Sequence, residues 1–300
     1  MPTLNKPWIH HLCLILLLFG LGGCGSHSLH TSLPPPDSTG VILFTQSDSR
    51  CGTTDPSWLD SERADQLAQT RQTTRQPFVP ITIPVAIHVI TQDGVVGDVP
   101  DPVLDEQMKV INQAFANSGF TFALASVDRT TNPAWFAMEN GSPEELEAKT
   151  TLSVDPSTTL NIYIATAADF LGWAYFPYSV ALRRNPALDG IVIDYESVPG
   201  GARVQFNEGD TATHEIGHWL GLYHTFQLGC FPPGDRVADT PYEGDPAEGC
   251  PVTRNTCNQR GLDPVFNFMD YSDDPCMNQF SLGQVARMQQ IASLFRPQLF

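Results

Sequence analysis

Basic residues are scarce in this chain of 300 residues: lysine and arginine together number 16, against 33 aspartates and glutamates, and the formal net charge is −17. Nucleic acid and anionic membrane surfaces are normally bound through an excess of basic residues, so the composition argues against both partners. It favours an acidic soluble protein whose carboxylates either bind cations or simply solvate the surface. The length allows one or two domains with a sizeable core, and we find no internal repeat.

The N-terminal region also lacks a segment of membrane-spanning length. The apolar run LCLILLLFGL, residues 12–21, is too short to cross a bilayer as a mature helix. It follows a polar or basic start and precedes small residues, which is the pattern of a cleaved signal peptide. The sequence LGGC, residues 21–24, resembles the lipobox of bacterial lipoproteins, so we expect residues 1–23 to be removed and Cys24 to be lipidated. The alternative is an ordinary secretory signal with an incidental cysteine, and in both cases the chain is exported.

Cysteine is infrequent, with seven residues in the whole chain. Cys13 falls within the signal peptide, and Cys24 is the lipidation candidate. Because an exported protein can oxidise its thiols, the four C-terminal cysteines suit two disulfides, although their order along the chain does not choose among the three possible pairings. Cys51 is left without a partner. The four C-terminal residues are Cys230, Cys250, Cys257 and Cys276.

The amino-acid composition and the hydrophobic pattern change near residue 79 and divide the chain into two parts. Residues 24–78 are rich in Ser, Thr, Pro, Asp and Gln and predict a tether, with one short helix that starts near Asp55 or Ser57. The remainder predicts one unit of catalytic size, 79–300, with lobes of about 79–221 and 222–300. Its β-branched runs and helical spacings alternate, which indicates an α/β or α+β layer sandwich. We expect strands at 81–91, 120–127, 159–166 and 189–195, an edge strand within 171–179, and helices capped by Asp101, Ser142 and Ser281.

The segment THEIGHWLGLYHTF carries the strongest chemical signal. His214 and His218 are four residues apart, so a helix places both imidazoles on one face, with Glu215 beside them. This is the HExxH arrangement of zinc hydrolases, in which the carboxylate acts on metal-bound water. Gly221 allows a left-handed helix end, after which the chain can turn back and supply His224 as a third ligand. Ordinary helix histidines would meet this extended spacing by chance in only about one chain in 10^5.

The extended motif is similar to that of the metzincin metallopeptidases, and the segment NFMDYSDDPCMNQF resembles their Met-turn. With GDRVADTP and GQVARM, these segments resemble the pappalysin family, especially its small, ulilysin-like microbial members, over roughly residues 79–300. The resemblance implies a metzincin-type domain: a twisted, mostly parallel sheet with the active-site helix in the N-terminal lobe, and an irregular, disulfide-linked C-terminal lobe that ends in a helix. It also implies a zinc endopeptidase in which Met269 lies beneath the metal ligands and Tyr271 stabilises the oxyanion.

The same resemblance accounts for the unpaired Cys51. Pappalysin-like zymogens carry a Cys-Gly-Thr motif in the pro-segment, and residues 51–53 match it. The implied mechanism is a cysteine switch, in which the thiolate fills the fourth zinc position and excludes water. A free or intermolecularly paired cysteine is the alternative. Activation would then require a cut between Cys51 and Pro80, and autolysis beside Arg71 or Arg75 is our hypothesis.

The resemblance further implies a disulfide pairing and a calcium site. The pairing is first to third and second to fourth, which gives Cys230–Cys257 and Cys250–Cys276. Pappalysin-like enzymes carry structural Ca²⁺ near the segment GCFPPGDRVADTP, where hard oxygen donors are available, although turn capping explains each donor equally well. The candidate calcium ligands are Asp235, Asp239 and Thr240.

Substrate preference is predicted from the residues after the Met-turn. A carboxylate of Asp273 or Asp274 there would favour Arg or Lys in a substrate that lies extended along 171–179, unless these residues only cap a turn or face solvent. The competing hypotheses are a metzincin of other specificity and an inactive, zinc-containing surface binding protein. Glu215 argues against the latter, since a structural zinc site needs no general base. We expect a monomer whose partners are peptides and its own pro-segment, anchored by lipid at first and released once cut.

Overall fold

The computed structural model describes residues 50–72, 78–259 and 261–300, which belong to one compact unit. The predicted signal peptide and the lipidation of Cys24 lie outside the described residues. The boundary between lobes at residue 221 stays a prediction. Among the described helices, none combines the length and apolar character that crossing a bilayer requires.

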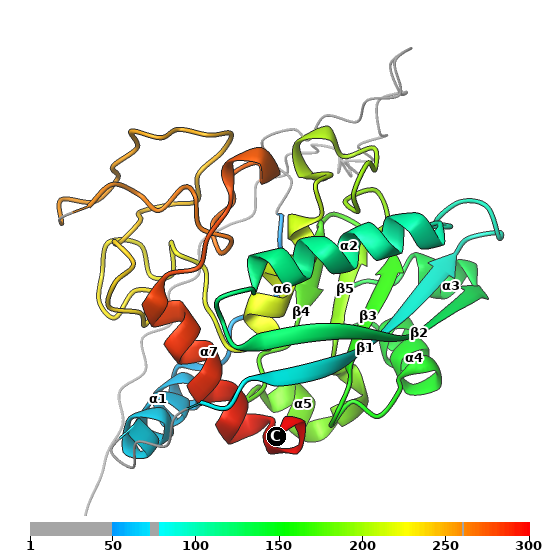
Figure 1. The fold of residues 1–300 in the computed structure, drawn as a ribbon, viewed down its shortest axis with the longest axis horizontal. Coiled ribbons are helices and arrows are strands. Elements are labelled where there is room, and N and C mark those ends of the chain that lie inside the picture. The colour runs from blue at the N-terminus through cyan, green and yellow to red at the C-terminus, as the bar shows by residue number, and fades with distance from the viewer. Residues whose placement is uncertain (1–49, 73–77, 260) are drawn as a thin grey trace, which may run out of the picture. The chain divides into compact units, whose positions relative to one another are not determined.

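Five strands form one sheet in the spatial order β2-β1-β3-β5-β4 (Figure 1). The pairs β2–β1, β1–β3 and β3–β5 are parallel, whereas β4 pairs antiparallel with β5 at the edge of the sheet. This mostly parallel sheet and its edge strand confirm the predicted architecture. The strands are β1 (Ile81–Thr91), β2 (Phe120–Thr131), β3 (Leu160–Ala165), β4 (Gly172–Ala174) and β5 (Ile191–Asp194).

The central strands are buried on both faces because they carry apolar side chains at successive positions. In β3, Ile162 and Ile164 join the core cluster on one face of the sheet, and Tyr163 joins the cluster on the other. In β5, Ile193 and Val192 divide in the same way. A sheet of this kind needs a helical layer on each side.

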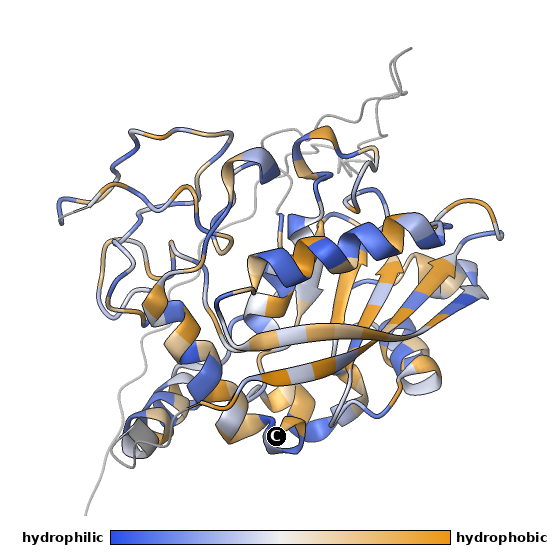
Figure 2. Ribbon diagram, viewed as in Figure 1, coloured by the Kyte–Doolittle hydropathy of each residue, from blue (hydrophilic) through white to orange (hydrophobic). Residues whose placement is uncertain are grey.

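Helices supply both layers. The α2 helix (Asp101–Ala114) and the α6 helix (Asp210–Trp219) contribute to the first core cluster, and α3 (Pro133–Phe136) and α4 (Pro143–Leu152) contribute to the second. Figure 2 shows the strands largely hydrophobic between these layers. The layers bring α6 against β4 and β5, so the HExxH motif lies beside the edge of the sheet.

The helix starts agree with the predicted caps except at α2. Ser142 caps α4 by accepting from the Glu145 nitrogen at 3.1 Å, and Ser281 caps α7 (Leu282–Phe295) in a capping box with Gln284. At α2 the expectation was wrong: the N-cap is Pro100, and Asp101 is the first helical residue. Its carboxylate pairs with a strand arginine instead of with a backbone nitrogen at the helix start.

The remaining elements lie toward the two ends of the described chain. The short helix expected in the tether is α1 (Trp58–Gln72), which packs against α7 (Figure 1). Between α6 and α7 the described residues form turns, loops and one short 3₁₀ helix, η3 (Asp274–Cys276). Two disulfides cross this region in the pairing implied by the resemblance, Cys230–Cys257 and Cys250–Cys276. The other short helices are α5 (Val180–Arg184), η1 (Pro186–Leu188), η2 (Val204–Phe206) and η4 (Pro297–Leu299).

Candidate active site

The start of α6, the helix of the HExxH motif, is fixed by a group from outside the helix. Its N-cap, Gly209, has a left-handed φ of 98° and offers no capping side chain. The buried carboxylate of Asp274 takes this role by accepting hydrogen bonds from the backbone nitrogens of Glu208 at 2.9 Å and Asp210 at 3.3 Å. A negative charge is also favourable at this end of the helix dipole.

The end of α6 depends on a glycine, as predicted. Gly221 has a φ of 97°, and a Cβ there would lie 2.5 Å from Cγ2 of Ile291 in α7. Any other residue would therefore meet both backbone strain and a clash. The turn reverses the chain and brings His224 beside His214 and His218.

The three imidazoles converge with their lone pairs facing inward. Nε2 of His218 lies 3.1 Å from Nε2 of His214 and of His224. Nδ1 of His214 lies 2.7 Å from the carbonyl oxygen of Phe268, and Nδ1 of His218 lies 2.8 Å from that of Leu222, so both Nδ1 atoms carry the proton. The facing Nε2 lone pairs would repel unless a cation lay between them. Nitrogen ligands of a tetrahedral zinc are about 3.3 Å apart, close to the observed spacing.

The electrostatics of the group also fit zinc. Burial lowers the pKa of all three histidines, that of His214 to about 4, so the imidazoles are neutral near pH 7. The Sγ atom of Cys51 completes the group: the potential ligand atoms of the four buried residues lie within 4.8 Å of one another. Burial and the carboxylate of Glu215 raise the pKa of the Cys51 thiol, an effect that bound Zn²⁺ reverses because it deprotonates a coordinating thiol. Imidazoles and a thiolate are the ligands that zinc prefers.

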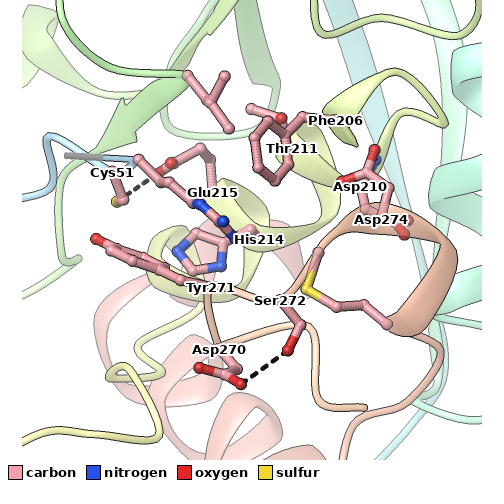
Figure 3. A pocket seen from close by; sticks show the side chains of 13 residues that line it. Cys51, Phe206, Asp210, Thr211, His214, Glu215, Asp270, Tyr271, Ser272 and Asp274 are labelled. Atoms are coloured by element: carbon pink, nitrogen blue, oxygen red, sulfur yellow. Dashed lines mark hydrogen bonds between the residues drawn. The ribbon is translucent and has the colours of Figure 1, made fainter. Parts of the chain in front are cut away.

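Glu215 lies beside the metal ligands and is engaged by the N-terminal segment (Figure 3). Its Oε2 atom accepts a hydrogen bond from the hydroxyl of Thr53 at 2.9 Å and a weaker one from Sγ of Cys51 at 3.5 Å. The Thr53 hydroxyl oxygen in turn accepts from the backbone nitrogen of Ala174 in β4 at 2.8 Å. Burial raises the pKa of Glu215 to about 8.

The predicted Met-turn residues lie next to the same site. Met269 is fully buried, and a Cβ on Gly217 of α6 would lie 2.4 Å from its Sδ atom, so the helix can pack on the sulfur only because it has glycine there. The ring of Tyr271 packs against His224 and His214 with centroids 5.1 Å and 5.9 Å apart. Burial raises the pKa of Tyr271, so its hydroxyl keeps a proton that it can donate.

Residues 50–53 lie beside β4, with one isolated parallel bridge between Cys51 and Gly172. The backbone nitrogen of Leu171 donates to the carbonyl oxygen of Arg50, and the nitrogen of Gly52 donates to that of Gly172, both at 2.8 Å. The segment therefore occupies the sheet edge where a substrate is predicted to lie. A Cβ at residue 52 would lie 2.7 Å from the ring of Phe170, so the close approach requires the glycine of the Cys-Gly-Thr motif.

A cavity opens beside the metal ligands, with Phe206, Asp210 and Tyr271 in its wall (Figure 3). Arg50 also lines it. The Arg50 guanidinium lies 4.2 Å from the ring centroid of Phe206 and 3.5 Å from the carboxylate of Asp273. Asp274 also lines the cavity, but its carboxylate caps α6. Burial raises the pKa of Asp210 to about 8 and that of Asp274 to about 7, and the nearby carboxylates add to the effect. Of the two predicted specificity residues, Asp273 is the one paired with an arginine.

The three predicted calcium ligands have hydrogen-bond partners within the protein. The hydroxyl of Thr240 donates to both carboxylate oxygens of Asp235, at 2.8 Å and 2.7 Å. Asp239 instead accepts from the Ser281 hydroxyl at 2.7 Å and from the Gly283 nitrogen at 2.8 Å, at the start of α7. Capping therefore accounts for Asp239. Calcium binding at Asp235, Asp239 and Thr240 stays a prediction.

Sequence reasoning missed several residues of the site. Arg50 could have been found from its position directly before Cys51, and Gly217 from its place inside the HExxH motif. Asn140, whose side chain contacts residue 52, gave no local signal because its role depends on a partner 88 positions away. Of the two proposed activation sites, Arg71 lies in the last turn of α1, and Arg75 lies outside the described residues.

Comparisons with known proteins agree with this geometry. The peptidase M43 family model, described as Pregnancy-associated plasma protein-A, matches residues 154–293. An extracellular metalloprotease of Colletotrichum graminicola is 41% identical over 256 residues, which cover 82% of this chain and 91% of that protein. Another from Pyricularia oryzae is 39% identical over 267 residues, covering 85% and 92%.

Two solved structures are also similar. A mutant of Tannerella forsythia promirolysin has a TM-score of 0.69 at 27% identity and covers 84% of this chain and 97% of that chain. Mature mirolysin from the same organism, in complex with a cleaved peptide, has a TM-score of 0.62 at 30% identity and covers 74% and 99%. The similarity thus extends to solved structures of both a precursor and a mature enzyme.

Proposed function

The chain belongs to the peptidase M43, or pappalysin, family of zinc metalloproteases, and from that premise we propose that it is made as a latent precursor and cleaves peptides at basic residues. The observation that carries the proposal is the Sγ atom of Cys51 among the three ligand imidazoles. Zinc bound there would polarise a water molecule and the scissile carbonyl. The zinc ion is not part of the polypeptide and has to be bound from solution.

The other steps of the reaction are assigned to groups around the metal ligands. Once residues 50–53 have left, the carboxylate of Glu215 is free to take a proton from the attacking water and pass one to the leaving amine. The hydroxyl of Tyr271, which keeps its proton, can donate to the developing oxyanion. The edge of β4 holds the substrate in an extended conformation through its backbone groups.

We propose that one short segment, residues 50–53, keeps the precursor inactive in three ways. Cys51 takes the position that water needs, Thr53 holds the carboxylate of Glu215, and residues 50–52 fill the edge of β4. Removing one of these contacts would weaken the block but leave the other two, so full activity requires the segment to leave the cleft as a unit. A cut between Cys51 and Pro80 would break the covalent link between the segment and the catalytic unit, so that the segment can dissociate.

The preference for basic residues is supported by Arg50. Its guanidinium occupies the cavity beside the metal site, pairs with Asp273 and stacks on Phe206. An arginine or lysine of a substrate would find the same carboxylate and ring when Arg50 has left. Without Arg50, the carboxylate of Asp273 would lose this counter-ion.

The predicted lipidation of Cys24 gives the cut a second consequence. The lipid would stay with the N-terminal fragment, so the precursor is anchored and the active enzyme is released. The extracellular relatives support export, and we propose a monomer after release. Structural calcium at Asp235, Asp239 and Thr240 belongs to the same proposal.

Substituting Glu215 tests the enzymatic hypothesis against an inactive zinc protein. We expect matured Glu215→Gln to keep one zinc per chain and to lose nearly all peptidase activity, because it removes the general base and no ligand. The wild-type protein, incubated with a peptide library with and without a chelator, is the control. Full activity of the variant, or cleavage by the wild type that survives removal of zinc, would contradict the mechanism.

A further inference from the structure

Asn140, in the loop between α3 and α4, holds the main chain of the segment in the cleft. Its Nδ2 atom donates to the backbone carbonyl oxygen of Gly52, whose nitrogen is bonded to Gly172 in β4. Both polar main-chain atoms of residue 52 are therefore held, and neither contact involves a side chain of that residue. Any extended chain along β4 could present a carbonyl oxygen to Asn140 in the same way.

The orientation of the Asn140 amide follows from its neighbours. The hydroxyl of Tyr175 lies 3.0 Å from Oδ1 of Asn140 and 2.7 Å from Oε2 of Glu145, so it can donate to either oxygen. Flipping the amide would place Oδ1 against the carbonyl oxygen of Gly52, two acceptors face to face. The amide therefore points its donor into the cleft.

A buried ion pair holds the loop that carries Asn140 in place. Glu145 and Lys149 of α4 are fully buried and 2.8 Å apart. The Glu145 carboxylate also accepts from Trp173 of β4 at 2.6 Å and from the Gly141 nitrogen at 2.7 Å, next to Asn140 in sequence. Burial alone would raise the pKa of the Glu145 carboxyl group. Lys149 and the hydrogen bonds from Trp173 and Tyr175 outweigh burial, so the pKa is lowered and the group stays ionised. Since a buried ion pair rarely adds net stability, its place between α4, β4 and this loop is better explained by positioning.

We propose that Asn140 binds the substrate main chain in the matured enzyme. The Arg50 cavity is proposed to take the residue that follows the scissile bond, so a substrate that fills it runs along β4 in the direction opposite to residues 50–52. The acceptor on the Gly52 side of the metal site is then the carbonyl oxygen of a substrate residue on the N-terminal side of the scissile bond. When residues 50–53 leave, Asn140, the Leu171 nitrogen and the Gly172 carbonyl oxygen each lose their hydrogen-bond partner in this segment. An extended peptide restores all three contacts. The inference rests on the proposed function, since it treats the pro-segment as a stand-in for substrate.

A truncation series of peptides tests the contact. Matured wild type and Asn140→Ala are compared on a long arginine-containing peptide and on peptides shortened one residue at a time from the N-terminus. We expect kcat/KM of Asn140→Ala to fall roughly three- to tenfold on the long peptide, the effect of one net hydrogen bond, and to match the wild type once the accepting residue is removed. Tyr175→Phe, which frees the Asn140 amide to rotate, should show part of the same length-dependent loss.

The controls separate binding from folding. Glu139→Ala changes the exposed neighbour in the same loop and should leave kcat/KM unchanged on every peptide. Zinc content and thermal unfolding are measured for each variant. An equal loss by Asn140→Ala on long and short peptides, or no loss on the long one, would overturn the proposal. If the wild-type enzyme cleaves none of the peptides, the proposed function itself is overturned. This outcome is distinguishable from failure of the Asn140 contact, because it is seen with the wild-type enzyme alone.

Discussion

The hydroxyl of Thr53 links two parts of the candidate active site, the carboxyl group of Glu215 and the edge strand β4. It donates to the carboxylate of Glu215 at 2.9 Å and accepts from the Ala174 nitrogen of β4 at 2.8 Å. A hydrogen bond to a charged or buried carboxylate contributes more than an ordinary one, about 1.5–3 kcal/mol. At this scale, the proposed latency would depend on Thr53 as well as on Cys51.

Replacing Thr53 by valine should therefore weaken latency while the fold is kept. Thr53→Val has nearly the same shape and removes only the hydroxyl, so we expect the uncut precursor to show about tenfold higher residual activity on a short peptide. Thr54→Val, at the exposed neighbouring position, is the matched control and should leave latency unchanged. If the Thr53 and Thr54 variants are equally latent, the hydroxyl has no part in the block.

At the scale of elements, α1 gives the proposed pro-segment a second set of contacts with the catalytic unit, separate from the cleft. Three of its carboxylates pair with arginines of the catalytic unit: Asp60 with Arg183, Glu62 with Arg236, and Asp65 with both Arg236 and Arg287. Ala64 and Ala68 of α1 pack in one apolar cluster with Phe176, Tyr178, Tyr223 and Ile291. A cut after α1 would leave these contacts intact.

We therefore expect a precursor cut between residues 73 and 79 to retain its N-terminal fragment at low salt and to release it at high salt. Arg236→Ala should speed the release, because its side chain is 7% exposed and both of its ion pairs are with α1. Arg183→Ala is the matched control with little effect, because that side chain is 52% exposed and solvent screens its pair with Asp60. Size-exclusion chromatography with mass spectrometry follows the fragment. Immediate release by the wild type at low salt would contradict a role of these contacts in holding the fragment.

The same element shows how far sequence reasoning reaches. The helix α1 was predicted from its local pattern, as β1 and β3 were from their β-branched runs, because burial on both faces leaves a regular signal. The metal ligands were predicted because all three lie within eleven residues of one helix and its turn. The docking of α1 was not predicted, because Asp65 and Arg287 are 222 positions apart and neither has a local signature.

At the scale of the whole molecule, the described region between α6 and α7 has little regular structure of its own. Its loops carry the Met-turn and the cavity wall, and they are closed by two disulfides with sequence separations of 27 and 26. Loops of this length predict about 3.5 kcal/mol of stabilisation from each disulfide, in a model that counts only chain entropy. The two disulfides differ in position, since Cys276 belongs to η3, next to Asp273.

Removing each disulfide in turn should therefore separate stability from specificity. We expect Cys250→Ala/Cys276→Ala and Cys230→Ala/Cys257→Ala to lose similar free energies of unfolding, about 3–4 kcal/mol, because their loops are nearly equal in length. Only the first double variant should lose preference for arginine over an uncharged residue, because it frees η3 and with it the carboxylates of the cavity wall. Thermal unfolding measures the stability, and kcat/KM for a matched pair of peptides measures the preference. If both variants lose the preference equally, the cavity depends on the region as a whole and not on the position of η3.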